Sequence, residues 1–219
     1  MRLWEKYRPS SLSELVGQPC LAALREFAAS PYSCCLLFEG PPGTGKTASA
    51  LALAADVGCK DQWSGLEIVP SVDLTIERCR ELFERTLRII PMAGNGWRVL
   101  VVEELEACSS VQVQRYLKVM LDTGLPPKLI VIATSNGTDD LDPALVQRFD
   151  QYLFRGDETL ARYGGDHLRQ IWFRETGGEK LPGDPVMWGW TGERWSFRTA
   201  MKVMQQHLAL HDRRLVPMA

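Results

Sequence analysis

Histidine is scarce in this sequence, and no zinc-type cysteine motif is present. Only three histidines occur among 219 residues, and the six cysteines contain no C-x-x-C pair. No histidine stands at metal-ligand spacing from a cysteine, so the pattern excludes the common structural zinc sites. We interpret the cysteines as reduced residues in the interior of a cytoplasmic protein.

A large charge of one sign is also missing. Lys and Arg total 25 and Asp and Glu total 27, which gives a formal net charge of −2. The molecule as a whole is therefore not expected to attract nucleic acid electrostatically. Contact with nucleic acid would require a local basic patch, or a surface that several subunits build together.

Long hydrophobic runs are absent as well. No apolar stretch approaches the roughly 20 residues that cross a bilayer, and the charged first seven residues lack the apolar region of a signal peptide. We find no internal repeat and no low-complexity stretch. With 45% hydrophobic and 24% charged residues, the composition is that of a globular protein, and we expect no membrane contact.

Short apolar runs alternate with helical patterns along the first two thirds of the chain. We predict strands at 34–38, 66–69, 98–102, 129–133 and 152–154. We predict helices at 47–57, at 76–87, and from a cap at Ser109 or Ser110 to residue 121. This order favours an α/β fold with a parallel sheet and helices on both of its faces.

The pattern changes near residue 155, after which helices without buried strands are predicted at 160–173 and 197–208. We therefore divide the chain into an α/β core, residues 1–154, and a small helical domain, residues 155–219. The connection between the two later helices holds Trp188 and Trp190, with Trp195 close by. These tryptophans form either the core of the helical domain or a patch that docks a partner.

A phosphate-binding motif follows the first predicted strand. Residues 40–47, Gly-Pro-Pro-Gly-Thr-Gly-Lys-Thr, match G-x-x-x-x-G-K-[ST] in full, between a strand and a helix. Glycines let backbone N–H groups turn toward phosphate oxygens, and the helix N-terminus adds positive potential. We expect Lys46 to reach the β- and γ-phosphates of ATP and the Thr47 hydroxyl to bind Mg²⁺. The predicted phosphate-binding residues are Gly40, Pro42, Gly43, Thr44, Gly45, Lys46 and Thr47.

Two consecutive carboxylates end the strand predicted at 98–102. We expect Glu103 to hold Mg²⁺, usually through water, and Glu104 to orient and deprotonate the attacking water. The alternative is a pair of surface carboxylates at a strand end.

The N-terminal segment gives a more specific indication. Trp4-Glu-Lys-Tyr-Arg-Pro9, then Leu15-Val-Gly-Gln18, then the P-loop resemble the opening of replication factor C small subunits and other clamp-loader-type AAA+ proteins. In that family this stretch lies over the adenine, so the resemblance implies adenine contacts from Tyr7, Arg8, Pro9 and Val16. An exposed arm of mixed charge is the alternative interpretation.

The resemblance continues in family order to about residue 208 and implies three further site residues. Asn136, which ends Ile-Ala-Thr-Ser-Asn, corresponds to sensor 1 and would help to position the attacking water. Arg148 corresponds to the arginine finger and would reach the neighbouring subunit's ATP, the alternative being an ion pair with Asp150. Arg198 corresponds to sensor 2 in the helical domain, here called the lid, and would reach the phosphates; a solvent-facing arginine is the alternative.

Departures from the family pattern concern the metal site, the finger and the end of the chain. Glu103 stands where Asp is usual, and residues 147–150, Gln-Arg-Phe-Asp, replace the Ser-Arg-Cys of clamp loaders. The sequence also stops after the lid, so we expect no collar domain of the clamp-loader kind.

The sequence leaves three functions open. The first is an ATPase that loads or remodels a DNA-associated complex, as a homo- or hetero-oligomeric ring or helix, with DNA and a sliding clamp or other DNA-processing protein as partners. The helix after Glu104 would then face DNA, although a solvated face is the alternative. The second is a protein-remodelling ATPase, against which the lack of an aromatic residue in 68–74 counts. The third is an ATP-binding scaffold with little turnover, which Glu103 alone favours. The residues of the helix after Glu104 that would face DNA under the first function are Gln112, Gln114, Arg115 and Lys118.

Overall fold

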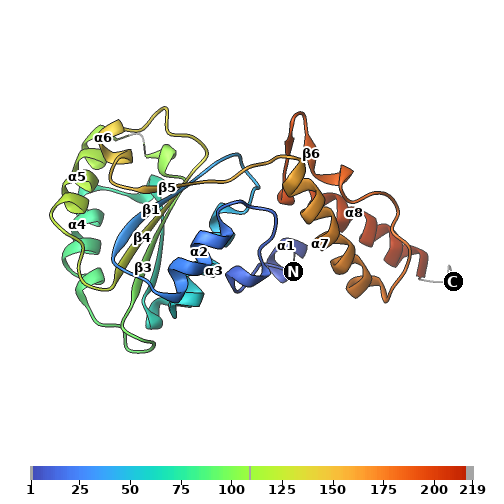
Figure 1. Ribbon diagram of the computed structural model, residues 1–219, viewed down its shortest axis with the longest axis horizontal. Coiled ribbons are helices and arrows are strands. Elements are labelled where there is room, and N and C mark those ends of the chain that lie inside the picture. Colours follow the sequence, from blue (N-terminus) through green and yellow to red (C-terminus); the bar gives the residue numbers. More distant parts are fainter. Residues whose placement is uncertain (1, 109, 216–219) are drawn as a thin grey trace.

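The computed structural model describes residues 2–108 and 110–215, which form an α/β core followed by a helical lid (Figure 1). The strands of the core are β1 (Cys34–Glu39), β2 (Leu66–Pro70), β3 (Arg98–Glu103), β4 (Leu129–Ser135) and β5 (Asp150–Leu153). A short helix, α1 (Leu3–Lys6), begins the chain, and the helices of the core are α2 (Leu21–Ala29), α3 (Lys46–Val57), α4 (Ile76–Glu84), α5 (Val111–Asp122) and α6 (Pro143–Val146).

The five core strands form one parallel sheet in the order β2-β3-β4-β1-β5. Continuous apolar runs build its centre: every residue of β4 is buried, as are the first five of β1 and of β3. Strands that are apolar on both sides require cover on both faces, which explains why the helices alternate with them. The predicted α/β fold is confirmed.

Two hydrophobic clusters lie on opposite faces of the sheet. Leu36 faces the layer formed by α2 and α3, whereas its neighbour Leu37 faces the layer formed by α4, α5 and α6, because successive side chains of a strand point to opposite sides. Both leucines are fully buried. Helix α2, which was not predicted, contributes Leu24 and Phe27 to the first layer.

The lid consists of two helices, α7 (Glu158–Thr176) and α8 (Phe197–Leu215), and a short hairpin between them. The hairpin pairs two antiparallel strands of two residues each, β6 (Trp190–Thr191) and β7 (Arg194–Trp195). The hairpin was not predicted. Its Trp195 is 0% exposed, and a Cβ on Gly164 of α7 would come within 2.1 Å of the indole ring. Trp188 and Trp190 pack against the same cluster, so these tryptophans form the lid core.

The N-terminal segment packs on the lid rather than on the sheet. Leu3 is buried in the lid cluster, and Lys6 forms an ion pair of 2.5 Å with Glu175 of α7. The Tyr7 hydroxyl donates to the same carboxylate, and burial followed by this contact raises the Tyr7 pKa to about 12. The first residues of the chain, which the sequence analysis assigns to the core, therefore pack on the lid.

Helix α5 begins as expected, since the Ser110 hydroxyl accepts from the Val113 N–H at 3.3 Å. The other predicted cap, Ser109, lies outside the described residues. Within residues 2–108 and 110–215, no helix is both long and apolar enough to span a membrane.

Candidate functional site

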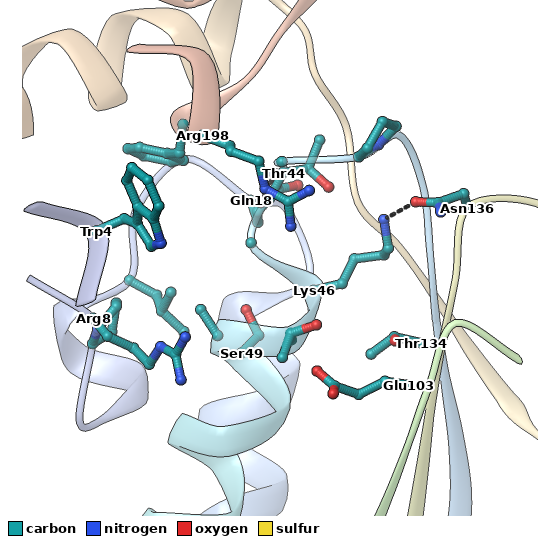
Figure 2. A pocket seen from close by; sticks show the side chains of 18 of the residues that line it. Trp4, Arg8, Gln18, Thr44, Lys46, Ser49, Glu103, Thr134, Asn136 and Arg198 are labelled. Carbon is teal, nitrogen blue, oxygen red and sulfur yellow. Dashed lines mark hydrogen bonds between the residues drawn. The ribbon is translucent and has the colours of Figure 1, made fainter. Parts of the chain in front are cut away.

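One cavity of about 470 Å³ opens at the carboxyl ends of β1, β3 and β4, where the core meets the lid (Figure 2). Loops that follow neighbouring parallel strands meet at this edge, which is where ligands of open α/β sheets bind. Residues of the N-terminal segment, the P-loop, the ends of β3 and β4, and the lid line the cavity together.

The P-loop connects β1 to α3 and has the backbone of a phosphate cradle. Gly43 and Gly45 have φ of 79° and 100°, values that residues with a side chain rarely adopt. Gly45 is the N-cap of α3 without a side-chain cap, and a Cβ there would meet no atom within 4 Å. The first amides of α3 thus have no side-chain cap, and together with the helix dipole they favour an anion at this end of the helix.

Lys46 extends across this cradle. Its ammonium donates to the carbonyls of Gly40 (2.6 Å) and Pro41 (2.9 Å) and to Asn136 Oδ1 (2.9 Å). Desolvation lowers the Lys46 pKa to about 8; Glu106 and Glu104 oppose this shift, and Arg198 adds to it. The lysine is thus held inside the cavity with its positive charge at a disadvantage, which an anionic ligand would relieve.

The two carboxylates at the end of β3 both line the cavity, together with Thr47 of α3. Glu104 adopts a left-handed backbone (φ 54°, ψ 55°), which costs about 1–2 kcal/mol for a residue with a side chain. Its N–H donates to Thr134 Oγ1 at 3.2 Å, and its carbonyl accepts from the Ser71 hydroxyl at 2.5 Å. These bonds hold the turn that directs Glu104 into the site.

A third carboxylate, Glu106, escaped the sequence analysis. It lies on a one-turn 3-10 helix, Leu105–Ala107, and it lines the cavity. Its carboxylate accepts hydrogen bonds from Ser135 Oγ (2.9 Å) and Asn136 Nδ2 (2.5 Å). Its place two residues after Glu104 was the available signal. Glu106 fixes the amide of Asn136 so that Oδ1 faces Lys46.

Arg198 enters the cavity from the first turn of α8 in the lid, as Figure 2 shows. The Arg198 side chain is also exposed to solvent, so its contact with the phosphates stays a prediction. The structure brings Arg198, Asn136 and Lys46 to one cavity from the lid, β4 and α3.

The opposite end of the cavity is more apolar. Tyr7, Arg8, Pro9 and Val16 all line the cavity, and the adenine contacts that the resemblance implies for them stay a prediction. Four further lining residues were not predicted: Trp4, His167, Phe197 and Met201. Burial, followed by the charge of Arg174, lowers the pKa of His167, which favours a neutral ring at this end of the site.

Arg148 lies outside the residues that line this cavity. Its guanidinium pairs with both carboxylate oxygens of Asp122, at the end of α5, with one contact at 3.2 Å. The alternative pairing with Asp150 is therefore wrong, because the turn after α6 directs Arg148 toward α5.

Helix α5 contains the four residues considered for DNA contact, and for one of them, Gln114, that prediction is wrong. Gln114 is 4% exposed, donates to the Cys108 carbonyl at 2.8 Å and accepts from the Asp142 N–H at 2.7 Å, so it ties the start of α5 to α6. Gln112 and Arg115 are exposed, and Lys118 is half-buried.

Comparisons with known proteins agree with this architecture. The family described as "ATPase family associated with various cellular activities (AAA)" matches residues 36–157. A structure described as "Structural Basis for Katanin Self-Assembly" aligns with 94% of this chain and 73% of that chain, with a TM-score of 0.65 and 21% identity, which supports the fold.

Curated relatives are named as replication factor C subunits. The Replication factor C small subunit of Methanosarcina barkeri is 33% identical over 112 residues, 49% of this chain and 34% of that protein. The small subunit of Thermofilum pendens is 38% identical over 108 residues, 48% of this chain and 33% of that protein. Replication factor C subunit 3 of Saccharomyces cerevisiae is 29% identical over 153 residues, 69% of this chain and 44% of that protein. The chain thus spans less than half the length of these relatives.

Proposed function

Because the chain belongs to the AAA family of ATPases, we propose that it binds ATP with Mg²⁺ in the cavity between core and lid and hydrolyses it between the subunits of an oligomer. The work of this hydrolysis is to load or remodel a DNA-associated complex. The observation that carries the proposal is the convergence of Lys46, Glu104, Asn136 and Arg198 on one P-loop cavity.

The residues of the cavity have separate roles in this proposal. Lys46 and the amides of the P-loop hold the β- and γ-phosphates, and the apolar end formed by Tyr7, Arg8, Pro9 and Val16 receives the adenine. Thr47 and Glu103 would hold Mg²⁺ through their oxygens, and the ion would supply positive charge that stabilises the transferring phosphoryl group.

Glu104 accepts the proton of the attacking water, and its left-handed turn sets the carboxylate in place. Asn136, oriented by Glu106, holds the water or the γ-phosphate on the opposite side. Arg198 contacts the phosphates from the lid, so lid position depends on whether the γ-phosphate is present.

Arg148 acts in a neighbouring subunit. It lies outside its own subunit's cavity, and its side chain is 36% exposed. An arginine finger is typically supplied across the interface between two subunits. Its pairing with Asp122 would be exchanged for the neighbour's γ-phosphate on assembly. An oligomer, as a ring or a helix, follows from this division of the site.

The DNA-associated role rests on the replication factor C relatives and on Arg115 and Lys118 of α5. One or two cations per subunit become a phosphate-tracking stripe when several subunits assemble. A sliding clamp or other DNA-processing protein is the partner that this role implies. The scaffold with little turnover remains the second candidate, because Glu103 is one methylene longer than the usual Asp.

The test is the ATPase rate measured against protein concentration, with and without single- and double-stranded DNA at fixed salt. A specific activity that rises with concentration and is stimulated by DNA is expected. A rate that ignores DNA would refute the DNA-associated role and keep the oligomeric ATPase. Absence of turnover in every condition, with ATP bound, would establish the scaffold instead.

A further inference from the structure

Gln18 uses its whole carboxamide to join two distant parts of the chain. The residue precedes α2, and it is 8% exposed. Its Nε2 donates to the Thr44 carbonyl at 3.0 Å and to the Arg155 carbonyl at 2.9 Å, and its Oε1 accepts from the Arg155 N–H at 2.8 Å. Gln18 thus connects the P-loop to the segment that leads from the core into the lid.

Only a carboxamide satisfies these partners. Both of its N–H groups meet carbonyl oxygens, and its oxygen meets an N–H. A glutamate would set a carboxylate oxygen against two carbonyls, and a methionine of similar length would leave three buried backbone groups without partners.

A second hydrogen bond runs beside the first from the P-loop to the lid. The Phe197 N–H, at the start of α8, donates to the Gly43 carbonyl at 2.9 Å. The Trp195 N–H donates to the Gly156 carbonyl at 2.9 Å, and this bond links the lid to the segment that connects it to the core. Two consecutive P-loop carbonyls, those of Gly43 and Thr44, therefore hold the lid and its connection.

The planarity of the peptide unit turns these contacts into a coupling. The carbonyl of Thr44 and the N–H of Gly45 are opposite ends of one rigid plane, as are the carbonyl of Gly43 and the N–H of Thr44. When such N–H groups turn toward phosphate oxygens, the attached carbonyls must turn with them. Gln18 and Phe197 receive that rotation, and Arg198 is the next residue of α8.

We infer that Gln18 is a positioning residue that transmits the conformation of the P-loop to the connection at Arg155, and so to the lid. The inference rests on the proposed function, since it takes the phosphates of ATP as the ligand that orients the P-loop. Gln18 touches no reacting atom, because its polar atoms are all engaged with backbone.

The experiment compares hydrogen exchange of backbone amides with and without a non-hydrolysable ATP analogue. In the wild type, the analogue should slow exchange in residues 43–47, 155–157 and 195–198. In Gln18→Met it should still slow exchange in 43–47, but its effect on 155–157 should fall about tenfold, the factor expected when one to two hydrogen bonds are lost. Turnover should fall by a similar factor while the KM for ATP changes less than threefold.

Gln114→Met is the matched control, because Gln114 is also a buried glutamine and bridges two backbone groups away from the P-loop. It should lower the melting temperature comparably yet keep the response of 155–157 to nucleotide. Gln18→Glu, which keeps the acceptor for Arg155, serves if Gln18→Met does not fold and should show the same loss.

A nucleotide response at 155–157 that survives in the Gln18 variants would overturn the inference and leave the proposed function intact. A wild-type protein that fails to bind the analogue would instead overturn the proposed function, and this inference with it.

Discussion

Nucleotide binding should be accompanied by proton uptake at Lys46. Burial lowers the pKa of this lysine from 10.5 to about 8, so about half of the free protein carries a neutral Lys46 at pH 8. The phosphates of ATP favour the ammonium form of Lys46. At pH 8 these phosphates are already fully deprotonated, since the highest pKa of a phosphate monoester is about 6. The binding reaction therefore draws its proton from the buffer.

The size of the effect follows from the same pKa. Uptake should be about half a proton per ATP at pH 8, and about a tenth at pH 7, where Lys46 is already protonated in most molecules. Isothermal titration calorimetry at each pH, in two buffers with very different ionisation enthalpies, measures this number directly.

Two variants isolate the lysine. Lys46→Arg should abolish the uptake at pH 8, because arginine stays protonated throughout this range. Lys60→Arg, at an exposed position outside the cavity lining, should leave the uptake unchanged. Equal binding enthalpies in both buffers at pH 8 for the wild type would refute the reasoning.

Proton linkage is a sharper test here than the pH dependence of stability. The lowered pKa of Lys46 makes the unfolded state bind more protons between about pH 8 and 10.5, so its contribution to stability rises across that window. Burial raises the pKa of Cys34 and of Cys35 to about 12. Because the unfolded thiols lose protons first, these groups lower stability above about pH 9. The two effects oppose each other where they overlap.

Three further predictions concern the chemistry and the lid. Glu104→Gln should keep ATP affinity and lower turnover by about 10²–10⁴, measured as steady-state phosphate release; an unaltered rate would remove Glu104 as the base. Arg148→Ala should bind ATP but lose turnover by about 10³ or more, and mixing it with the P-loop variant Lys46→Ala should restore activity, because each supplies what the other lacks. No recovery in the mixture would contradict action between subunits. Trp195→Ala should cost about 3–5 kcal/mol of unfolding free energy in denaturant titrations, whereas Trp63→Ala, at a residue 59% exposed, should be nearly neutral. Similar losses in both would refute the role of Trp195 as the lid core.

The sequence was most informative where the determinants are local. The P-loop is eight consecutive residues, and the runs that form β1, β3 and β4 are continuous stretches of apolar side chains, so neighbours along the chain define each element. The carboxylates after β3 and the asparagine after β4 could be assigned to one edge because parallel strands end together.

Motif order placed other residues only in part. The resemblance implied that Tyr7 and Val16 lie near the nucleotide, and both line the cavity. It did not reveal that the first helix packs on the lid. The lid contacts of Leu3 and Lys6 join residues more than 160 positions apart, and nothing in either segment alone encodes that pairing.

Sequence alone, then, determined the α/β fold and the phosphate cradle, because glycine geometry and strand burial are properties of consecutive residues. Tertiary structure decided which polar side chains act at the site and which hold the scaffold. Gln114 and Gln18 are the same residue type, yet one is a bridge between α5 and α6 and the other joins the P-loop to the lid connection. A glutamine takes its role from the backbone groups that long-range packing brings to it, and these lie 28 and 137 residues away along the chain.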